Sequence, residues 1–499
     1  MNAPLRRVGM VMLILFALLF ANLNWVQVYK ADQYRTDDVH NRVRVQQQEY
    51  ERARGQIIVD GKAVAESVET NDTLRFLRKY PAKEIYAHVV GYRPVNLAAT
   101  DIERLENEFL SGTADTFAAD RLLEMFTGKE SAGGNLVLSV RKQVQETAYK
   151  ELINNQTSTK RGAVVALDPS TGAILGLVST PSFDPNPLAS HDADTAQQAF
   201  EKLDKDPSKP LLNRAISDTF PPGSTFKVIV SAAALQAGLS LDTTLTGGRT
   251  YTARDTSTPI SNAPGVNCPD QITLKNALRV SCNTAFARLG VEQVGADRLK
   301  QTARDFGLES VPLFDRDKDN IMRVAASHTG DIQGPDGQVD RAALAQSSIG
   351  QREVRITPLQ GAMVAAAIAN NGVQMRPYLI GTLQGPDLRP VDRAEEKDLR
   401  RSVSPEVAAQ LREMMESVVD GGTGTAAQIS GFDVGGKTGT AQDGDRPDHG
   451  WFIGYAMKNG RPIVAVAVML QNAGSGGSRE ATRIAGEVMD AAIKAEGLK

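Results

Sequence analysis

Ser224 and Lys227 stand three residues apart in a segment that predicts the start of a buried helix. Pro221-Pro222-Gly223 leads into the pair, and the residues that follow are mostly apolar. Because positions three apart share one face of a helix, the hydroxyl and the amine lie side by side. A serine becomes a good nucleophile when a neighbouring base removes its proton. Lysine serves as that base where burial or a nearby cation lowers its pKa. The pair therefore predicts acyl transfer through Ser224.

The Ser-x-x-Lys pattern is weak evidence by itself, because the chain contains a second copy at Ser139 and Lys142. That copy lies in a polar stretch typical of an exposed amphipathic helix. We therefore assign it no chemistry.

Two further motifs supply partners for the first pair. Ser281-Cys282-Asn283 lies between two helical stretches, where a short loop can point a hydroxyl and a carboxamide into one cleft. Taken alone, such a serine is more often a helix cap. Lys437-Thr438-Gly439-Thr440 has the pattern of a strand in which Gly439 lets a ligand backbone lie close. A lysine placed there would be the cation that lowers the pKa of Lys227.

The third motif overlaps a nucleotide-binding pattern. Residues Gly431 to Thr438 fit G-x-x-x-x-G-K-[ST] letter by letter. A phosphate-binding loop needs a buried strand before it and a helix after it. The residues from Gly439 to Pro447 do not favour a helix, so we reject nucleotide binding.

Composition excludes several other classes. The net charge of −3 over 499 residues, with no basic run, predicts no nucleic-acid partner. The five histidines are scattered without metal-binding spacing, so we expect no metal site and no cofactor. Cys268 and Cys282, the only cysteines, are either one disulfide or two unpaired small hydrophobes.

The N-terminus predicts a membrane anchor. Arg6 and Arg7 precede an apolar run from Val8 to Val28, whose 21 residues would span roughly 30 Å as a helix. Arginines before the run keep the N-terminus cytoplasmic and place the rest outside the cell membrane. A cleaved signal peptide is the alternative, although the run is long for one.

Ser-x-x-Lys, Ser-x-Asn and Lys-Thr-Gly in this order are the three signatures of the penicillin-interacting serine enzymes. The chain resembles the class B penicillin-binding proteins over nearly its whole length after the anchor, and within them the A-type proteins of actinobacteria. Further stretches that carry the resemblance are Arg54-Gly55-Gln56-Ile57, Gly162–Pro185, Gly350-Gln351 and Ala369-Asn370-Asn371-Gly372. Arg352 departs from the family pattern, which has glycine there, and leaves the shape of that loop open.

The pattern and the resemblance together predict an α+β fold. We expect an anchor over 1–30, a small pedestal domain over 31–155 and a transpeptidase domain over 156–499. In the last, an antiparallel sheet built from both ends of the domain is flanked by helices and joined by an all-α subdomain. In the pedestal we expect strands at 56–59 and 87–90, a helical stretch at 101–110 and an irregular segment at 111–134.

The resemblance also implies residue roles. Ser224 would be the acylated nucleophile and Lys227 its base, with Ser281 and Lys437 relaying the proton to the leaving group. Asn283 would hold the substrate backbone. Thr438 and Thr440 would bind the terminal carboxylate beside Gly439, and the backbone N–H groups of Ser224 and Thr440 would form the oxyanion hole.

The implied function is a peptidoglycan D,D-transpeptidase that cross-links stem peptides and is inhibited by β-lactams. A membrane glycan polymerase and division proteins are the partners that the family leads us to expect. A D,D-carboxypeptidase and a β-lactamase or β-lactam sensor are alternatives of the same fold. A non-catalytic scaffold of the division machinery is the alternative from another class.

Overall fold

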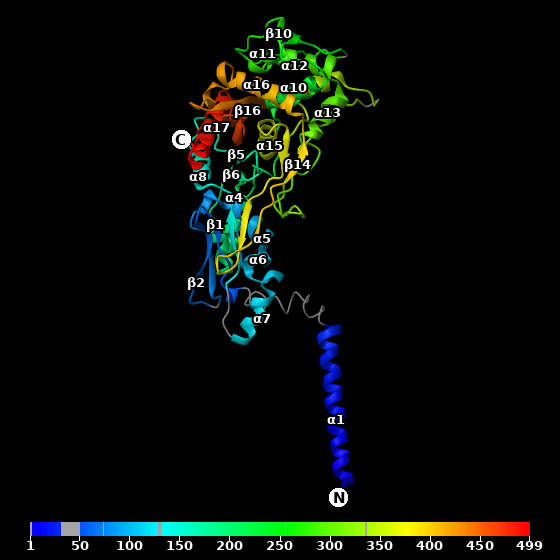
Figure 1. Ribbon diagram of the computed structural model, residues 1–499, viewed down its shortest axis with the longest axis vertical. Helices are drawn as coiled ribbons and strands as arrows, with labels where there is room; N and C mark the ends of the chain where they lie inside the picture. The colour runs from blue at the N-terminus through cyan, green and yellow to red at the C-terminus, as the bar shows by residue number, and fades with distance from the viewer. Residues whose placement is uncertain (1, 31–49, 73, 128–131, 255, 335–336) are drawn as a thin grey trace.

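The structure, a computed structural model, describes residues 2–30, 50–72, 74–127, 132–254, 256–334 and 337–499. Residues 31–49 of the predicted pedestal therefore lie outside the described residues. Figure 1 shows a long N-terminal helix at one end, a smaller body with a sheet next to it and a larger body at the other end.

The N-terminal helix is α1 (Asn2–Asn24), which continues as a single π-helical turn over Trp25–Tyr29. Its apolar window runs from Arg6 to Tyr29, with a mean hydropathy of 2.0 and no burial inside the protein. An exposed apolar helix of 24 residues is long enough to cross a bilayer core. The predicted anchor is thus present as a candidate membrane span.

The smaller body contains a six-stranded sheet in the order β13-β12-β4-β1-β2-β3. Asp60 and Gly61 both have positive φ and form the tight turn between β1 and β2. Two of the six strands, β12 and β13, come from a hairpin more than 240 residues further along the chain than β4. The bounds are β1 (Ile57–Val59), β2 (Lys62–Glu69), β3 (Phe76–Lys79), β4 (Asn135–Leu138), β12 (Ile380–Gln384) and β13 (Pro390–Arg393).

Two expectations for this body were wrong. Residues 87–90 form the short helix α4 (Ala87–Val90) and not a strand. All four side chains are buried, so the run has no alternation of apolar and polar positions that would distinguish a strand from a helix. The segment 111–134 is not irregular throughout, since it contains α7 (Ala118–Thr127). The helical stretch at 101–110 is confirmed as α5 (Asp101–Leu105) and α6 (Asn107–Ser111).

A buried ion cluster joins the strands of this body to α5. The Glu103 carboxylate accepts from Arg54 Nε at 2.7 Å and from Arg78 Nε at 2.6 Å, and the three side chains are almost fully buried. Burial by itself raises the pKa of Glu103, but the two guanidinium groups outweigh it and hold that pKa at about 2. The contribution of this cluster to stability is therefore present above the ordinary carboxyl pKa and is lost as the pH falls toward 2.

Glu103→Gln is expected to lower the free energy of unfolding by about 3–5 kcal/mol, because two buried cations lose their counter-charge. The matched control is Glu69→Gln, which breaks the exposed pair of Glu69 with Arg75 and should cost less than about 1 kcal/mol. Scanning calorimetry of both variants measures the effect. Equal losses would contradict the role of the cluster.

The larger body is built on a five-stranded antiparallel sheet in the order β15-β16-β17-β5-β6. The C-terminal strand β17 lies next to the N-terminal strand β5, which confirms the prediction that both ends of the domain build the sheet. The strands are β5 (Gly162–Leu167), β6 (Ile174–Thr180), β15 (Asp433–Asp443), β16 (Arg446–Lys458) and β17 (Arg461–Leu470).

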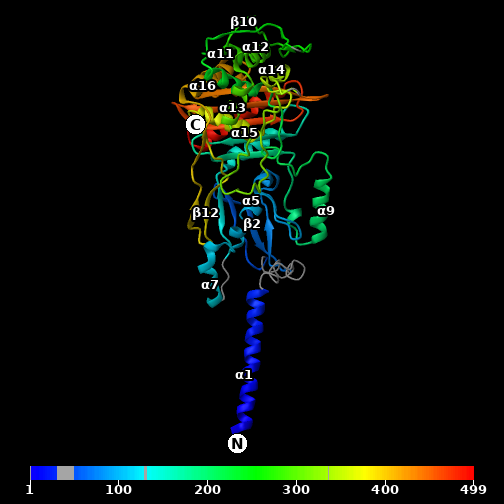
Figure 2. The same cartoon turned by 90° about the vertical axis from the view of Figure 1, so that its right-hand side faces the viewer.

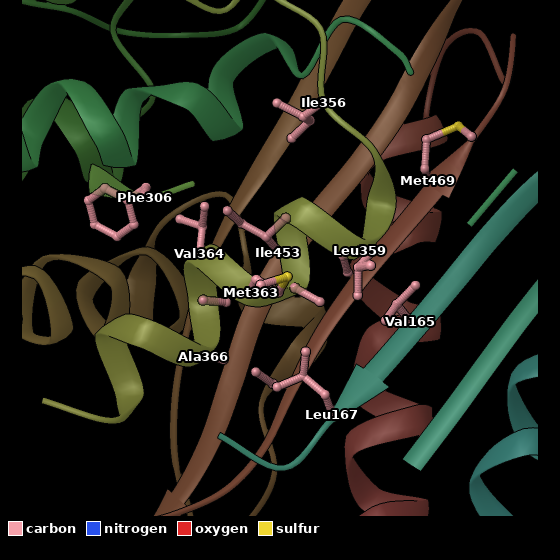
Figure 3. Close-up of a cluster of buried hydrophobic side chains, with 14 of the residues drawn as sticks. Val165, Leu167, Phe306, Ile356, Leu359, Met363, Val364, Ala366, Ile453 and Met469 are labelled. Carbon is pink, nitrogen blue, oxygen red and sulfur yellow. The ribbon is translucent and has the colours of Figure 1, made fainter. Parts of the chain in front are cut away.

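Helices cover both faces of this sheet. α8 (Lys142–Ile153) and α17 (Gly477–Ala495) pack on one face and α15 (Pro358–Ala369) on the other. In Figure 3 the side chains of Leu359 and Met363 on α15 lie against Val165, Ile453 and Met469 of the strands. Alternating strand residues thus divide between two apolar cores, which fixes the register of the sheet.

The remaining helices and short strands of the larger body surround α10 (Lys227–Gln236). Figure 2 shows this mainly helical region at the end of the molecule farthest from α1. Its elements are β7 (Thr244–Thr246), β8 (Thr250–Tyr251), β9 (Ile260–Ser261), β10 (Gln271–Thr273), α11 (Leu274–Arg279), α12 (Asn283–Leu289), α13 (Ala296–Asp305), α14 (Arg341–Ser347) and α16 (Pro405–Gly421). Outside it lie α9 (Ala193–Asp204) and the pair β11 (Val373–Met375) and β14 (Asp398–Arg401). The expected α+β architecture is confirmed, whereas the exact domain boundaries stay a prediction.

Candidate active site

Ser224 and Lys227 lie where a turn of 3-10 helix over Gly223–Phe226 passes into α10. Side chains three residues apart eclipse each other in a 3-10 turn. The turn therefore brings Lys227 Nζ to 3.1 Å from Ser224 Oγ, whereas the sequence predicted a plain α-helix from Ser224. α10 is buried along nearly its whole length and packs among α11, α13 and α16, so this geometry is held rigidly.

The Lys227 amine is surrounded by oxygen atoms of two kinds. The carbonyl oxygen of Ser281 at 2.9 Å and Oδ1 of Asn283 at 2.6 Å can only accept hydrogen bonds. A neutral amine has two protons for these acceptors and one lone pair left over. The hydroxyl groups of Ser224, at 3.1 Å, and Ser281, at 3.3 Å, are the donors in reach of that lone pair. The contacts thus orient a neutral Lys227 as a base toward Ser224.

Burial favours the neutral form of this amine. Lys227 is 0% exposed, and burial, assisted by the charge of Lys437, holds its pKa well below the ordinary value. Burial also lowers the pKa of Lys437, to about 7. Two buried lysines joined by one serine cannot both carry a proton cheaply. The pair therefore supplies one base and one cation near neutral pH.

Ser281 joins the two lysines. Its Oγ lies 3.3 Å from Lys227 Nζ and 3.0 Å from Lys437 Nζ, which gives a continuous line of contacts from Ser224 to Lys437. Ser281 has a φ of +62°, in the left-handed region of backbone conformation that residues other than glycine rarely adopt. Such backbone strain persists where the surrounding structure enforces it.

Neighbouring segments enforce this loop conformation. Cys282 forms a disulfide with Cys268, so of the two possibilities left open the bridge is the one present. Asn262 Oδ1 accepts from the backbone N–H of Asn283 at 2.8 Å, and Asn283 Nδ2 donates to the carbonyl oxygen of Ser261 at 2.9 Å. That second bond fixes which end of the Asn283 amide faces Lys227. No sequence signal pointed to Asn262 or Ser261.

Lys437 lies on β15, the edge strand of the five-stranded sheet, and is 0% exposed. A Cβ on Gly439 would lie 2.7 Å from the carbonyl oxygen of Pro222, and one on Gly223 would lie 2.3 Å from that of Thr440. The two glycines thus allow the strand to pack directly against the turn that carries Ser224. Thr440 beyond them is exposed.

Thr438 has a partner that sequence reasoning missed. Its Oγ1 lies 2.6 Å from Oγ1 of Thr423, in the loop after α16. Thr423 has no motif of its own and lies 15 residues before Thr438, so only the tertiary structure brings it to the site.

The loop at Gly350 packs against the turn that carries Ser224. The carbonyl oxygen of Gly350 accepts from the N–H of Gly223 at 2.9 Å, and a Cβ on Gly350 would lie 2.0 Å from the carbonyl oxygen of Gly223. Arg352, the departure from the family glycine, has a φ of +61°. The loop therefore keeps a left-handed turn at this position despite the arginine, which pairs with Asp340 at 3.1 Å.

The competing patterns lie outside this site. Ser139, between β4 and α8, donates to the carbonyl oxygens of Ile174 and Tyr378, and Lys142 pairs with Glu146 on the surface. Lys437-Thr438 runs in the middle of an 11-residue strand and not in a loop before a helix, which excludes a phosphate-binding loop. Among the described residues, no group of three or more His, Cys, Asp and Glu side chains could hold a metal ion.

The sheet, the buried helix α10 and the Ser–Lys–Ser–Lys line have the arrangement of a serine enzyme with a buried lysine beside the serine. Comparison with known proteins identifies the family. Residues 162–490 match the penicillin-binding protein transpeptidase domain, and residues 54–136 match the penicillin-binding protein A dimerisation domain. The chain belongs to the class B penicillin-binding proteins.

Relatives match along nearly the whole chain. The peptidoglycan D,D-transpeptidase PbpA of Mycolicibacterium smegmatis is 44% identical over 95% of this chain and 94% of its own length. PbpA of Mycobacterium tuberculosis is 41% identical over 99% and 100%. The structure of penicillin-binding protein A from M. tuberculosis as a ceftriaxone acyl-enzyme complex superposes with a TM-score of 0.83, at 41% identity, covering 90% of this chain and 100% of that one. The corresponding imipenem acyl-enzyme has a TM-score of 0.82, at 42% identity, covering 89% and 99%.

Proposed function

We propose that this protein is a peptidoglycan D,D-transpeptidase that forms an acyl-enzyme at Ser224 and is inhibited by β-lactams. The observation that carries the proposal is the line of contacts Ser224–Lys227–Ser281–Lys437, in which both lysines are fully buried. Two relatives are named peptidoglycan D,D-transpeptidases. Two structures of penicillin-binding protein A from M. tuberculosis are acyl-enzyme complexes, one with ceftriaxone and one with imipenem.

In the proposed mechanism, neutral Lys227 takes the hydroxyl proton of Ser224 as Oγ attacks the penultimate D-Ala carbonyl carbon. The peptide C–N bond breaks, an ester forms at Ser224, and the terminal D-Ala leaves as an amine. Its nitrogen receives a proton through Ser281, which lies between the two lysines. An amine of a neighbouring stem peptide then attacks the ester carbonyl. Lys227 accepts a proton from that amine and passes it to Ser224 Oγ as the ester bond breaks, which regenerates the Ser224 hydroxyl.

The other assigned residues bind the donor. Thr438 and Thr440 hold the terminal carboxylate next to the charge of Lys437, and the substrate backbone lies beside Gly439 along the edge strand β15 as an added strand. Asn283, whose amide already contacts Lys227, orients the peptide. The N–H groups of Ser224 and Thr440 stabilise the oxyanion, a role supported by the close packing of Gly223 against Thr440.

The location follows from two observations. α1 is an exposed helix whose apolar stretch follows Arg6 and Arg7, and arginines on that side would place the catalytic body outside the cell membrane. The Cys268–Cys282 disulfide is typical of proteins that work in an oxidising space. A membrane glycan polymerase and division proteins remain proposed partners, with α1 and the smaller body as their contact.

The test is mass spectrometry of the full-length protein after incubation with benzylpenicillin. We expect the intact mass to rise by one penicillin and the adduct to map to the peptide that contains Ser224. We also expect the adduct to persist for hours, because the class is inhibited and does not turn the drug over. An adduct on the peptide of Ser139 would overturn the assignment of the nucleophile. Release of penicilloate within seconds would instead identify a β-lactamase.

A further inference from the structure

Exposed apolar side chains gather on two segments of the smaller body. Leu122, Leu123 and Phe126 lie on α7, and Phe126 is 82% exposed. Leu388, 60% exposed, and Val391 lie on the β12–β13 hairpin. Among the described residues beyond α1 and its π-helical turn, four other large apolar side chains are exposed, none above 46%. Clusters of exposed apolar side chains mark surfaces that meet another molecule or a membrane.

The two segments lie at the same end of the molecule. β12 pairs with β4, which follows α7, and Asn135 Nδ2 donates to the carbonyl oxygen of Gly385 at the start of the hairpin turn. Figures 1 and 2 both place α7 beyond the end of the sheet, on the side of α1 and opposite to the catalytic sheet. We call Leu122, Leu123, Phe126, Leu388 and Val391 the apolar end face.

The chain from the membrane anchor enters the folded body beside this face. Residues 50–55 are the first described after Lys30. Arg52 Nη1 donates to the carbonyl oxygen of Gly112 at 3.3 Å, and the N–H of Gly133 donates to the carbonyl oxygen of Ala53 at 2.8 Å. Gly112 and Gly133 bracket the segment that contains α7. Arg52 and Ala53, at the start of the described body, are thus hydrogen-bonded to both ends of that segment.

The start of α7 is fixed to the body while its apolar face stays outside. Phe117, just before α7, is buried against Phe109 with ring centroids 5.0 Å apart. Arg121 Nη1 donates to the carbonyl oxygens of Gly112 and Ala114. The helix is therefore not a free tail, and its exposed leucines and phenylalanine project from a supported base. A helix with one apolar face beside a membrane anchor fits the interface of a bilayer.

We propose that the apolar end face lies in the lipid headgroup region and sets the height of the catalytic body above the membrane. The proposal rests on the membrane anchoring by α1 proposed above. With α1 spanning the bilayer and the chain joining the described body at residues 50–53, the apolar end face beside this entry point becomes the part of the body that meets lipid. The catalytic sheet at the opposite end then faces away from the membrane.

The test uses spin labels on the full-length protein in lipid nanodiscs. Its two native cysteines are joined in a disulfide, so a label reacts with one introduced cysteine. Phe126→Cys and, independently, Leu388→Cys carry the label on the face. Ile153→Cys, at the exposed end of α8, is the matched apolar control, and Leu18→Cys in α1 is the control for lipid contact. Collision rates with oxygen and with an aqueous nickel chelate report the depth of each label.

We expect the labels at 126 and 388 to lie roughly 5–10 Å deep, at the boundary between the headgroups and the acyl chains, while that at 153 remains in water. Water-exposed labels at both face positions, with lipid contact at position 18, would overturn the proposal and leave the anchoring intact. That outcome would assign the face to a protein partner. A water-exposed label at position 18 would instead refute the anchoring itself.

Discussion

Lys227→Met is expected to slow the acylation of Ser224 by benzylpenicillin on the order of 10²–10⁴-fold, the usual contribution of a general base. Lys227 Nζ lies 3.1 Å from Ser224 Oγ, and methionine fills the same buried space without a lone pair able to accept the proton. Stopped-flow measurement of the second-order rate constant for acylation gives the effect.

The second Ser-x-x-Lys copy offers a matched control for this variant. Lys142→Met removes the same functional group from the same four-residue pattern, but Lys142 is exposed beside Glu146. Its acylation rate should equal that of the unmodified protein. Unchanged acylation in Lys227→Met, with the adduct still on Ser224, would show that another group is the base.

Lys437→Met is expected to have opposite effects on activity and on stability. Burial lowers the pKa of Lys437 to about 7, so the unfolded chain binds a proton between pH 7 and the ordinary lysine pKa that the folded protein does not. The stability of the unmodified protein therefore rises with pH across that window. Methionine removes both the cost of the buried charge and this pH dependence. We expect Lys437→Met to be more stable at pH 7 by about 1–3 kcal/mol.

Acylation by the same variant should fall on the order of 10²-fold or more, because the carboxylate of the donor loses its cation. In the pH profile of the remaining acylation rate, the acid limb should move to higher pH. The charge of Lys437 contributes to the lowered pKa of Lys227, and without it that pKa rises. A structural role alone would reduce the rate without moving the pH profile.

Lys458→Met, on the neighbouring strand, is the control for the Lys437 variant, since Lys458 contacts Phe432 and lies outside the site. It should leave both the rate and the pH profile unchanged. A Lys437→Met protein that is less stable than the unmodified one would contradict the cost assigned to the buried charge.

Parts of the fold that rest on local pattern were predictable. The buried helix after Gly223 is one such part, because its Pro-Pro-Gly start and its apolar run lie within a short window. Ala87–Val90 was wrongly assigned as a strand because a run of only four residues, all of them buried, carries no period. The β12–β13 hairpin could not be assigned to the smaller sheet, since its partner β4 lies more than 240 residues away in the chain.

The sequence by itself determined that Ser224 and Lys227 share one face, because that relation is local to a single turn of helix. The order of the family motifs also identified Ser281, Asn283 and Lys437 as site residues, although nothing in the sequence says how close together they lie. Only the tertiary structure decided that Ser281 stands between two buried lysines, that Cys268 and Cys282 are bridged, and that Thr423, Asn262 and Gly350 support the site. The reason is physical: burial or a nearby cation lowers a lysine pKa, and at this site both come from segments far apart in the chain.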